Sequence, residues 1–570
     1  MSLIDHYREI PRPALESEAA PLTSKERWIA VAGLLVLLAL KIVFAFHRQI
    51  DSDEPQHLHT VWAWATGQLP YVNVFDNHMP LFQWLCSPLF RAFGERADIV
   101  RMMRLAMIPL YFGVLWCVFR ITSILHSAQA GLWAMLFTGF CPKFFFVSTE
   151  FRTDDLWTSV WMVALLVALG GRFAGRRALI FGFLVGIAFA ISMKTTLLLG
   201  TLALAGGAVL FLRWSRSGVT DWPALAKSIG LALVAGLIPP TAVAIYFAAH
   251  GAWSEFVYCV FQHNVVPGVI ETNGIPVAGR PYYFPVAAPI LLFLAWRLLR
   301  KGRDYETMGL LSLATGFYLT ALWSYWPILS DEDYEPFYPM LFIVLIPFAF
   351  ELCRKIARWQ ATRAWQVGVF AAIAIFFQMW LVFTQHLFTD ATVEDVRMVA
   401  DVLKLTTPDQ YVMDGKGETV FRRRPFYYAM ETMTDARFAR GVIKDDIAER
   451  IIKTQAPVAR LDRLPHAGHR FVAANYLKVT RRLLVLGKDL AAAPAESGLL
   501  AGSRKFEIAV PARYTVLDNK GKPLPGKLDG ESCTGGKWLE AGVHTFIPES
   551  PCDGLRVLWA DAFEKGYRPL

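Results

Sequence analysis

Long apolar stretches alternate with short polar segments over about two thirds of the chain. Each stretch is close to the roughly 20 residues that an α-helix needs to cross a bilayer. The pattern predicts eleven spans, at about residues 28–48, 103–124, 128–147, 156–171, 178–193, 196–212, 226–248, 284–299, 307–325, 337–353 and 366–385. The chain is therefore expected to be a polytopic α-helical membrane protein.

The same pattern divides the chain into three regions. Residues 1–27 are polar, with acids and bases mixed, and are expected to form a cytoplasmic N-terminal segment without a cleavable signal peptide. Residues 28–385 form the predicted membrane module, which includes a long first loop at residues 49–102. Residues 386–570 have the character of a soluble domain.

The two non-membrane segments carry their own secondary-structure signals. In the first loop, residues 57–66 and 81–93 are amphipathic, which is typical of helices lying on a membrane surface. The C-terminal domain is predicted to be a small α/β region followed by a β-rich end, with helices at residues 392–405 and 444–454 and strands at residues 470–475 and 505–510.

Composition and charge fit a membrane protein. Hydrophobic residues make up 55% of the 570 residues and charged residues 18%, against roughly 45–50% and 25% in soluble domains. The net charge of +9 does not indicate nucleic-acid binding, because the basic residues crowd alternate short loops. The segment 172–177 holds three arginines, whereas four loops on the opposite side hold only Arg152, Lys194 and Arg280. This asymmetry predicts a cytoplasmic N-terminus, with the first loop and the C-terminal domain outside.

Three acidic clusters lie at the predicted outer ends of spans. Residues 51–59 follow the first span, residues 150–155 precede the fourth, and residues 331–335 precede the tenth. Each cluster alone is also typical of a solvated helix end. Because the loops of a bundle converge on one face, we expect the three clusters to line one outward cavity, where costly hydrophilic groups are usually functional.

Several short motifs follow one another in a fixed order. They are Asp53-Glu54, Gly67-Gln68-Leu69-Pro70-Tyr71, Asp76-Asn77-His78-Met79-Pro80-Leu81, Arg152-Thr153-Asp154, Lys194 at the end of the fifth span, and Tyr334-Glu335-Pro336-Phe337-Tyr338-Pro339. Over roughly residues 28–350 this order resembles the GT-C glycosyltransferases of the protein mannosyltransferase and aminoarabinose transferase type (families 39 and 83). Met79 stands where that family often has proline. The resemblance implies a GT-C fold and an enzyme of the bacterial inner membrane that transfers a sugar from a polyprenyl-phosphate donor.

The resemblance also implies which residues do the chemistry. Phosphate leaves without a strong general acid, so one carboxylate suffices to take the proton of the acceptor hydroxyl in an inverting transfer, and cations stabilise the leaving phosphate. The implied catalytic residues are Asp53, Glu54 and Asp154, with Asp53 as the base. The implied substrate-binding residues are Asp51, His57, His78, Arg152, Asp155, Lys194, Arg280, Tyr334 and Tyr338. The implied partners are the lipid-linked donor, a glycan, lipid or protein acceptor, and membrane lipids, without nucleic acid.

Other interpretations remain open at this stage. Lys194 could extend its ammonium to the membrane surface, Arg152 could merely pair with Asp154 or Asp155, and Arg280 could contact lipid head groups. Tyr334 and Tyr338 could belong to an aromatic belt. No cofactor is predicted. A divalent cation stays open, although His57 and His59 do not share a helix face. The main alternative function is a multi-pass transporter of a lipid-linked or polar substrate, and a non-catalytic scaffold is a third interpretation.

The C-terminal domain holds two cysteines, Cys533 and Cys552, separated by turn-rich sequence. In an oxidising compartment such a pair normally forms a disulfide. Closing a loop of this size is worth about 3 kcal/mol in the chain-entropy model. A bridge is therefore expected if the domain lies outside, with two unrelated buried thiols as the alternative.

Overall fold

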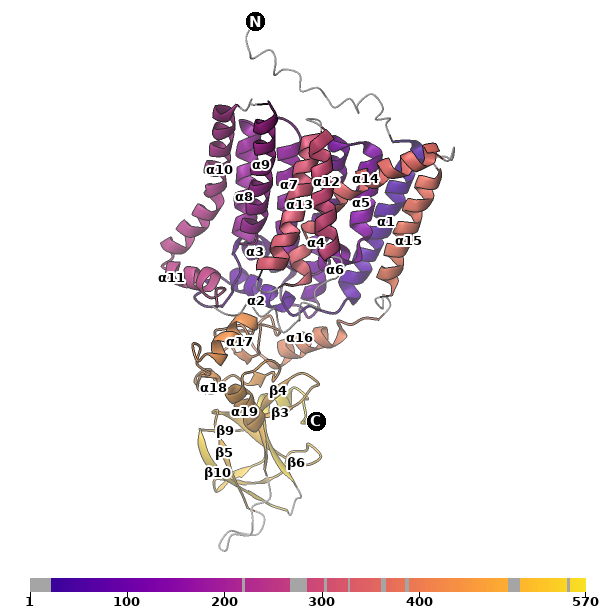
Figure 1. Ribbon diagram of the computed structural model, residues 1–570. Coiled ribbons are helices and arrows are strands. Elements are labelled where there is room, and N and C mark those ends of the chain that lie inside the picture. Colours follow the sequence, from indigo (N-terminus) through magenta and orange to yellow (C-terminus); the bar gives the residue numbers. More distant parts are fainter. Residues whose placement is uncertain are drawn as a thin grey trace.

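The structure, a computed structural model, describes residues 22–217, 221–266, 284–301, 305–326, 329–359, 365–384, 389–490, 503–550 and 554–570. It shows a bundle of long helices and, beside one end of the bundle, a C-terminal region that holds the β-sheets (Figure 1). Arg280 and Cys552 lie outside the described residues. The predictions on Arg280 and on the disulfide therefore stay predictions.

A helix lies at the position of each predicted span, and the third is divided into two helices. The helices are α1 (Ser24–His47), α4 (Ile99–Leu125), α5 (Ala128–Phe140), α6 (Pro142–Val147), α7 (Thr153–Leu169), α8 (Arg176–Ile191), α9 (Thr195–Ser217), α10 (Trp222–Ala249), α12 (Phe284–Lys301), α13 (Glu306–Tyr325), α14 (Phe337–Trp359) and α15 (Trp365–Phe383). Among the described residues, α1, α4, α9 and α10 are long and apolar enough to cross a membrane by themselves. The protein is thus an integral membrane protein, and the number of its spans stays a prediction.

Local sequence explains how these helices begin and how they pack. At the start of α1, the Thr23 side chain accepts a hydrogen bond from the Glu26 amide, and the Glu26 carboxylate accepts one from the Thr23 amide. This capping box satisfies amides that a helix end leaves unpaired. Helices α8 and α10 approach closely at Gly182 and Gly186, where an added Cβ would lie 1.9 Å from the Ala232 carbonyl oxygen and 2.2 Å from that of Gly236. Small residues of this spacing let membrane helices pack backbone to backbone.

Between α1 and α4 the chain forms α2 (Glu54–Ala65) and α3 (Leu81–Phe93), which lie at the end of the bundle nearest the C-terminal region (Figure 1). The bounds agree with the amphipathic stretches, but α2 differs from the predicted surface helix, because every residue from Glu54 to Trp64 is buried. The C-terminal region covers it: the Val420 carbonyl lies 2.8 Å from Nδ1 of His59. The short helix α11 (Trp253–Val257) and the π-helix Tyr258–Gln262 lie at the same end.

The C-terminal region contains helices and two sheets. Its helices are α16 (Val393–Leu405), α17 (Thr432–Ala439), α18 (Ile447–Thr454), α19 (His466–Asn475) and α20 (Ala560–Glu564). Its strands are β1 (Val412–Met413), β2 (Val458–Ala459), β3 (Tyr476–Lys478), β4 (Leu484–Leu490), β5 (Arg504–Ile508), β6 (Ala512–Asp518), β7 (Gly526–Leu528), β8 (Glu531–Cys533), β9 (Lys537–Leu539), β10 (Gly542–Pro548) and β11 (Leu555–Trp559). One sheet has the order β1-β2-β4-β11-β6-β9 with β3 also on β4, and the other has the order β5-β10-β7-β8.

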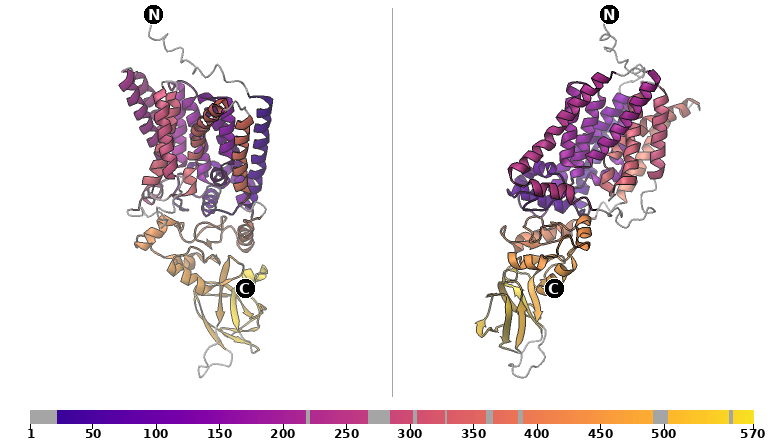
Figure 2. Two further views of the ribbon diagram at one scale, coloured as in Figure 1. Left: turned by 45° about the vertical axis from the view of Figure 1, so that its right-hand side comes forward. Right: turned by 60° about the vertical axis from the view of Figure 1, so that its left-hand side comes forward.

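The predicted sheet-rich character of the C-terminal region is confirmed, but the predicted strand at residues 470–475 is wrong. These residues belong to α19, whose buried positions, Gly468 and Val472, are four apart. That spacing is one helical turn. The strand begins only at Tyr476, after the helix ends. Helices α16 and α17 lie between the bundle and the sheets, as two further views also show (Figure 2).

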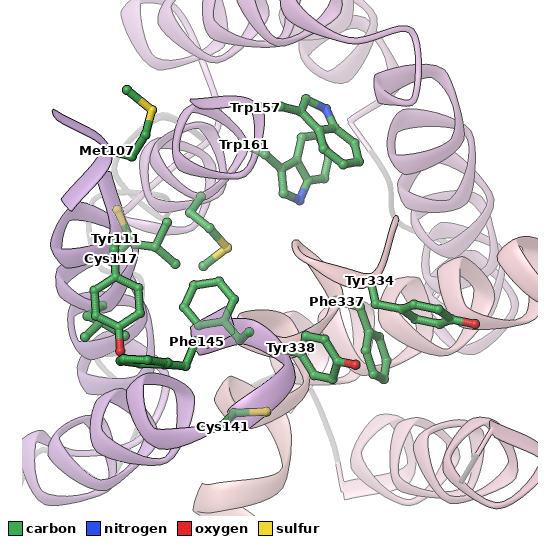
Figure 3. Close-up of a cluster of buried hydrophobic side chains, with 14 of the residues drawn as sticks. Met107, Tyr111, Cys117, Cys141, Phe145, Trp157, Trp161, Tyr334, Phe337 and Tyr338 are labelled. Carbon is green, nitrogen blue, oxygen red and sulfur yellow. The ribbon is translucent and has the colours of Figure 1, made fainter. Parts of the chain in front are cut away.

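The hydrophobic core of the bundle is rich in aromatic side chains (Figure 3). Tyr334 and Tyr338 belong to this core and pack on Phe337, with ring centroids 6.4 Å and 5.6 Å from it. They are therefore buried and do not form an exposed belt, and their predicted contact with substrate stays a prediction. A separate aromatic cluster, which includes Tyr71, Phe75, Phe247 and Phe256, also contains Ala429 and so joins the α2–α3 segment to the C-terminal region.

Candidate active site

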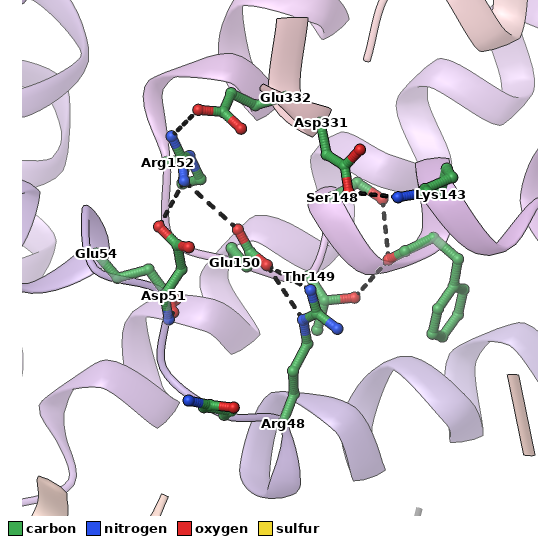
Figure 4. A network of polar contacts seen from close by, with 12 residues as sticks. Arg48, Asp51, Glu54, Lys143, Ser148, Thr149, Glu150, Arg152, Asp331 and Glu332 are labelled. Atoms are coloured by element: carbon green, nitrogen blue, oxygen red, sulfur yellow. Dashed lines mark hydrogen bonds and ion pairs between the residues drawn. The ribbon is translucent and has the colours of Figure 1, made fainter. Parts of the chain in front are cut away.

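Arg152 brings the three predicted acidic clusters together. It precedes α7 in extended conformation and is 5% exposed. Its guanidinium lies 2.6 Å from Oδ1 of Asp51 and 2.5 Å from Oε1 of Glu332 (Figure 4). It also lies 2.7 Å from Oδ2 of Asp53. Asp51 and Asp53 come from the first cluster, Arg152 from the second and Glu332 from the third. The expected convergence at one end of the bundle is thus observed.

Lys194 forms a further link between the second and third acidic clusters, in addition to Arg152. Its Nζ lies 3.0 Å from Oδ1 of Asp154 and 2.7 Å from Oδ1 of Asp333. Burial lowers the pKa of Lys194, but Asp154 and Asp333 outweigh burial and raise it above its usual value. The ammonium is therefore held charged between two carboxylates, and it does not extend away to the membrane surface.

Asp53 is held by cations on both carboxylate oxygens. Arg152 contacts Oδ2, and Nζ of Lys416 forms an ion pair with Oδ1. Burial raises the pKa of Asp53, but the charges of Arg152 and Lys416 outweigh burial and hold it well below its usual value. Asp53 is thus a carboxylate, and its side chain is 25% exposed. We call the following residues the charged cluster: Asp51, Asp53, Arg152, Asp154, Lys194, Glu332, Asp333 and Lys416.

Lys416 was not found by sequence reasoning. It comes from the C-terminal region, 363 positions from Asp53. The only signal near it is the turn-rich, charged segment Asp414-Gly415-Lys416-Gly417-Glu418, and nothing in that pattern indicates a partner in the membrane module. Lys416 is 5% exposed, so this loop reaches into the interface.

Glu54 has a different environment from Asp53, although the two are adjacent. Both oxygens of Glu54 bind the buried Arg104 guanidinium, at 2.7 Å and 2.5 Å. They also accept hydrogen bonds from the amides of Phe151 and Asp51. Arg104 in turn donates to the carbonyl of Arg48, just beyond the end of α1, at 2.7 Å. The Glu54–Arg104 ion pair thus links α4 and the second acidic cluster to the end of α1. Because both oxygens of Glu54 are already bonded, a structural role is favoured for this residue.

Asp155 also has other partners than its neighbour Asp154. It is buried beside Glu335 and Lys41, and burial together with Asp155 raises the pKa of Glu335 well above its usual value. Nζ of Lys41 donates to the Phe145 carbonyl at 2.7 Å and to Ser148 and Thr149 at 2.8 Å. Lys41 and Arg104 were both missed in the sequence. Lys41 is recognisable only as a lone basic residue within an apolar span.

His57 and His78 lie next to the charged cluster, with ring centroids 4.6 Å apart. Nδ1 of His78 lies 2.7 Å from Oδ1 of Asp76. Burial lowers the pKa of His78, but Asp76 outweighs burial and raises it above its usual value. Burial, followed by the charges of His78 and Arg152, lowers the pKa of His57 well below its usual value. His57 is therefore neutral, whereas His78 favours its charged form.

The His57 ring is a buried polar group without a partner. It is 1% exposed, and in the described part of the chain neither ring nitrogen has a hydrogen bond. Such groups are rare and costly in native structures, and each one calls for an explanation, such as a catalytic role. His59 points elsewhere, to Val420 and Trp62. Among the described residues, no group of three His, Cys, Asp or Glu side chains is arranged to hold a metal ion.

Two cavities lie near the α2 helix. One, of about 620 Å³, is lined by charged side chains of both signs, including Asp51 and Glu150 beside the bundle and Glu418, Arg460 and Arg463 in the C-terminal region. The other, of about 580 Å³, is lined largely by aromatic and apolar groups, including Trp64, Trp84, Leu85, Pro88 and Tyr246. The first cavity includes Asp51 of the charged cluster, whereas the second lies at the other end of α2, at Trp64.

Comparison with known proteins gives one family match and similar folds. Residues 77–239 match the family described as dolichyl-phosphate-mannose-protein mannosyltransferase. The fold is similar to that of ArnT from Cupriavidus metallidurans in the apo state, with a TM-score of 0.55 and 15% identity over 81% of this chain and 98% of that chain. It is also similar to the same protein bound to undecaprenyl phosphate, with a TM-score of 0.53 and 16% identity over the same shares. No curated protein matches the sequence significantly. The resemblance to GT-C glycosyltransferases of the ArnT and protein mannosyltransferase type is thereby confirmed.

Proposed function

We propose that the protein is an inverting membrane glycosyltransferase that moves a sugar from a polyprenyl-phosphate donor to a hydroxyl acceptor on the outer face of the membrane, with Asp53 as the base. The observation that carries the proposal is the partnerless His57 ring beside Asp53, Arg152, Lys416 and His78. The ArnT-like fold and the match to the mannosyltransferase family support it.

The donor phosphate fits the cationic side of this site. The His78 imidazolium and the N–H of neutral His57 are donors that an anionic oxygen would satisfy. Fixed cations are worth most where negative charge develops, here on the phosphate as it leaves. Lys194 carries a second positive charge beside the same cluster. The ArnT structure that was solved with undecaprenyl phosphate supports a lipid phosphate as the ligand.

The isoprenoid chain of the donor fits the apolar cavity. Helix α2 carries His57 near its start and Trp64 near its end, and at about 1.5 Å per residue these lie roughly 10 Å apart along the helix. Trp84 and Leu85, which line this cavity, are 51% and 47% exposed. Exposed large apolar groups at the end of a membrane bundle suit contact with a lipid chain.

The acceptor fits the polar cavity. Asp51 and Ser52 line it, so it opens beside Asp53. An acceptor hydroxyl would lose its proton to Asp53 while its oxygen bonds to the anomeric carbon. The bond from that carbon to the phosphate oxygen breaks, and its electron pair leaves with the phosphate. Charged groups of both signs in the cavity wall suit a polar, hydroxyl-bearing acceptor.

The test is transfer by the purified full-length protein in detergent or vesicles. A panel of radiolabelled undecaprenyl-phosphate sugars is supplied with candidate glycan, lipid and peptide acceptors. We expect one donor to be consumed, and we expect Asp401→Asn to keep this activity, because Asp401 contacts Tyr567 instead of the charged cluster. Transport of an intact lipid-linked sugar across vesicles without any transfer would contradict the proposal and favour the transporter.

A further inference from the structure

The loop that carries Lys416 is rigidly built. The Asp414 carboxylate accepts hydrogen bonds from the amides of Gly417 and Thr419, at 2.7 Å and 2.8 Å, and pairs with Arg424 at 2.9 Å. The Lys416 amide donates to Glu418 at 2.7 Å. These contacts lie within the C-terminal region and fix the loop conformation, so the direction of the Lys416 side chain is well defined.

The loop is also pressed against α2. Gly417 has φ +85°, and an added Cβ would lie 2.8 Å from Cβ of His59. Only glycine adopts this conformation without strain, and only glycine leaves room for the imidazole. The position of Lys416 is therefore set by contact with the helix that also carries His57.

The two cations on Asp53 are held very differently. Arg152 lies within 4.0 Å of five carboxylates, those of Asp51, Asp53, Glu150, Asp154 and Glu332. In the described part of the chain, Lys416 has a carboxylate partner only in Asp53. Moving Arg152 would leave four further carboxylates without its charge, whereas moving Lys416 removes the cation from only one oxygen of Asp53. A lysine ammonium on a flexible stem is also suited to changing partners.

We propose that Lys416 is a positioning residue for Asp53: it holds Oδ1 of Asp53 in the substrate-free site and shifts its ammonium onto the donor phosphate when the donor binds. Oδ1 then keeps only the neutral Ser52 hydroxyl, which donates to it at 3.2 Å, and can take the acceptor proton, while Arg152 keeps Oδ2 in place. The C-terminal region thus completes the active site and couples donor binding to the release of the base. This inference rests on the proposed function, because it assigns a further residue to the same site.

Binding of undecaprenyl phosphate to the purified full-length protein tests this without any transfer reaction. We expect Lys416→Met to weaken binding at least tenfold and Lys416→Arg to restore most of it. Glu95→Gln is the matched control, because the Glu95–Arg422 ion pair, at 3.0 Å, also joins the α2–α3 end to the C-terminal region without touching Asp53. Equal affinity of Lys416→Met and wild type would overturn the proposal.

A second variant covers the case in which Lys416→Met does not fold. Gly417→Ala keeps the ammonium but displaces the loop from His59, so it should also weaken lipid-phosphate binding. A purely structural role would lower the melting temperature of Gly417→Ala and Glu95→Gln alike and leave the affinity of both unchanged, which would contradict the inference.

The pH profile of transfer gives an independent readout. The titratable and charged groups around Asp53 are Asp51, His57, His78, Arg152 and Lys416. Loss of the Lys416 charge should move the acid limb of kcat/KM upward by about one pH unit, since a neighbouring cation lowers a carboxylate pKa by about 1–3 units. An unmoved limb would contradict the role at Asp53. If wild type binds undecaprenyl phosphate but transfers no sugar, the proposed function fails while the Lys416 contact can still be tested.

Discussion

The helical bundle and the C-terminal region contribute to the site in different ways. The bundle brings Asp53, Arg152, Asp154 and Lys194, all of which lie at span ends in motifs that can be recognised in the sequence. The C-terminal region brings Lys416 from a loop without any recognisable motif. Membrane topology forces the span ends onto one face, whereas the docking of a soluble region depends on surface fit. The comparison therefore teaches that the residues of this site are only partly visible along the sequence.

The largest effect on activity should come from substitution of Asp53, whose carboxylate contacts cations from both regions. Asp53→Asn keeps the size of the side chain but removes the charge and the proton acceptor. Transfer should fall by roughly 10²–10⁴-fold, the usual contribution of a general base, while the protein still folds. The measurement is kcat with labelled donor, together with the melting temperature. Activity near that of wild type would remove Asp53 from the mechanism.

Substitution of the neighbouring Glu54 should have the opposite result: a loss of stability instead of a loss of turnover. Glu54→Gln leaves the Arg104 guanidinium, which is fully buried, without its carboxylate. Breaking a buried ion pair by removing one partner costs about 3–5 kcal/mol. We therefore expect a large fall in melting temperature and yield, with normal turnover for the fraction that folds. A stable Glu54→Gln protein without activity would instead return Glu54 to the catalytic residues.

This contrast between neighbours shows why the sequence could predict the place of the site but not every role. The length of the apolar stretches predicted the helix positions, because each membrane helix must satisfy its own backbone and stay apolar across the bilayer. The acidic and basic residues at the predicted span ends indicated which groups gather at one end of the bundle. Their order could not assign different roles to Asp53 and Glu54, or to Asp154 and Asp155, because successive residues on a helix or turn point in different directions. It could not find Arg104 or Lys416, because their partners lie 50 and 363 positions away.

A smaller effect on activity is expected from substitution of Lys194, which links the second and third acidic clusters. Lys194→Ala leaves Asp154 and Asp333 without their shared ammonium. A hydrogen bond from a charged group to the donor phosphate is worth about 1.5–3 kcal/mol, so kcat/KM for the donor should fall roughly 10- to 100-fold. Lys194→Arg is the control that keeps the charge. Unchanged donor saturation in Lys194→Ala would limit Lys194 to a structural role.

The smallest effect should be a pH dependence of lipid-phosphate binding, which we assign to His78 of the membrane module. Because Asp76 raises the pKa of His78, its positive charge is present at low pH and is lost as the pH rises through that raised value. Affinity for undecaprenyl phosphate should therefore fall by about tenfold as the pH rises through the raised pKa of His78, since a hydrogen bond to a charged group is worth about 1.5–3 kcal/mol. The probe itself changes little there, because the second pKa of a phosphate monoester is about 6.

His78→Gln should flatten this profile, and that variant is needed because a second group titrates nearby. Burial raises the pKa of Glu150 to about 7, and Glu150 pairs with Arg48 and lies 3.7 Å from Arg152. Glu150→Gln keeps His78, so its affinity should still fall with rising pH. If the fall persists in His78→Gln and disappears in Glu150→Gln, the titrating group is Glu150, and the lipid phosphate is recognised through Arg152 instead of His78.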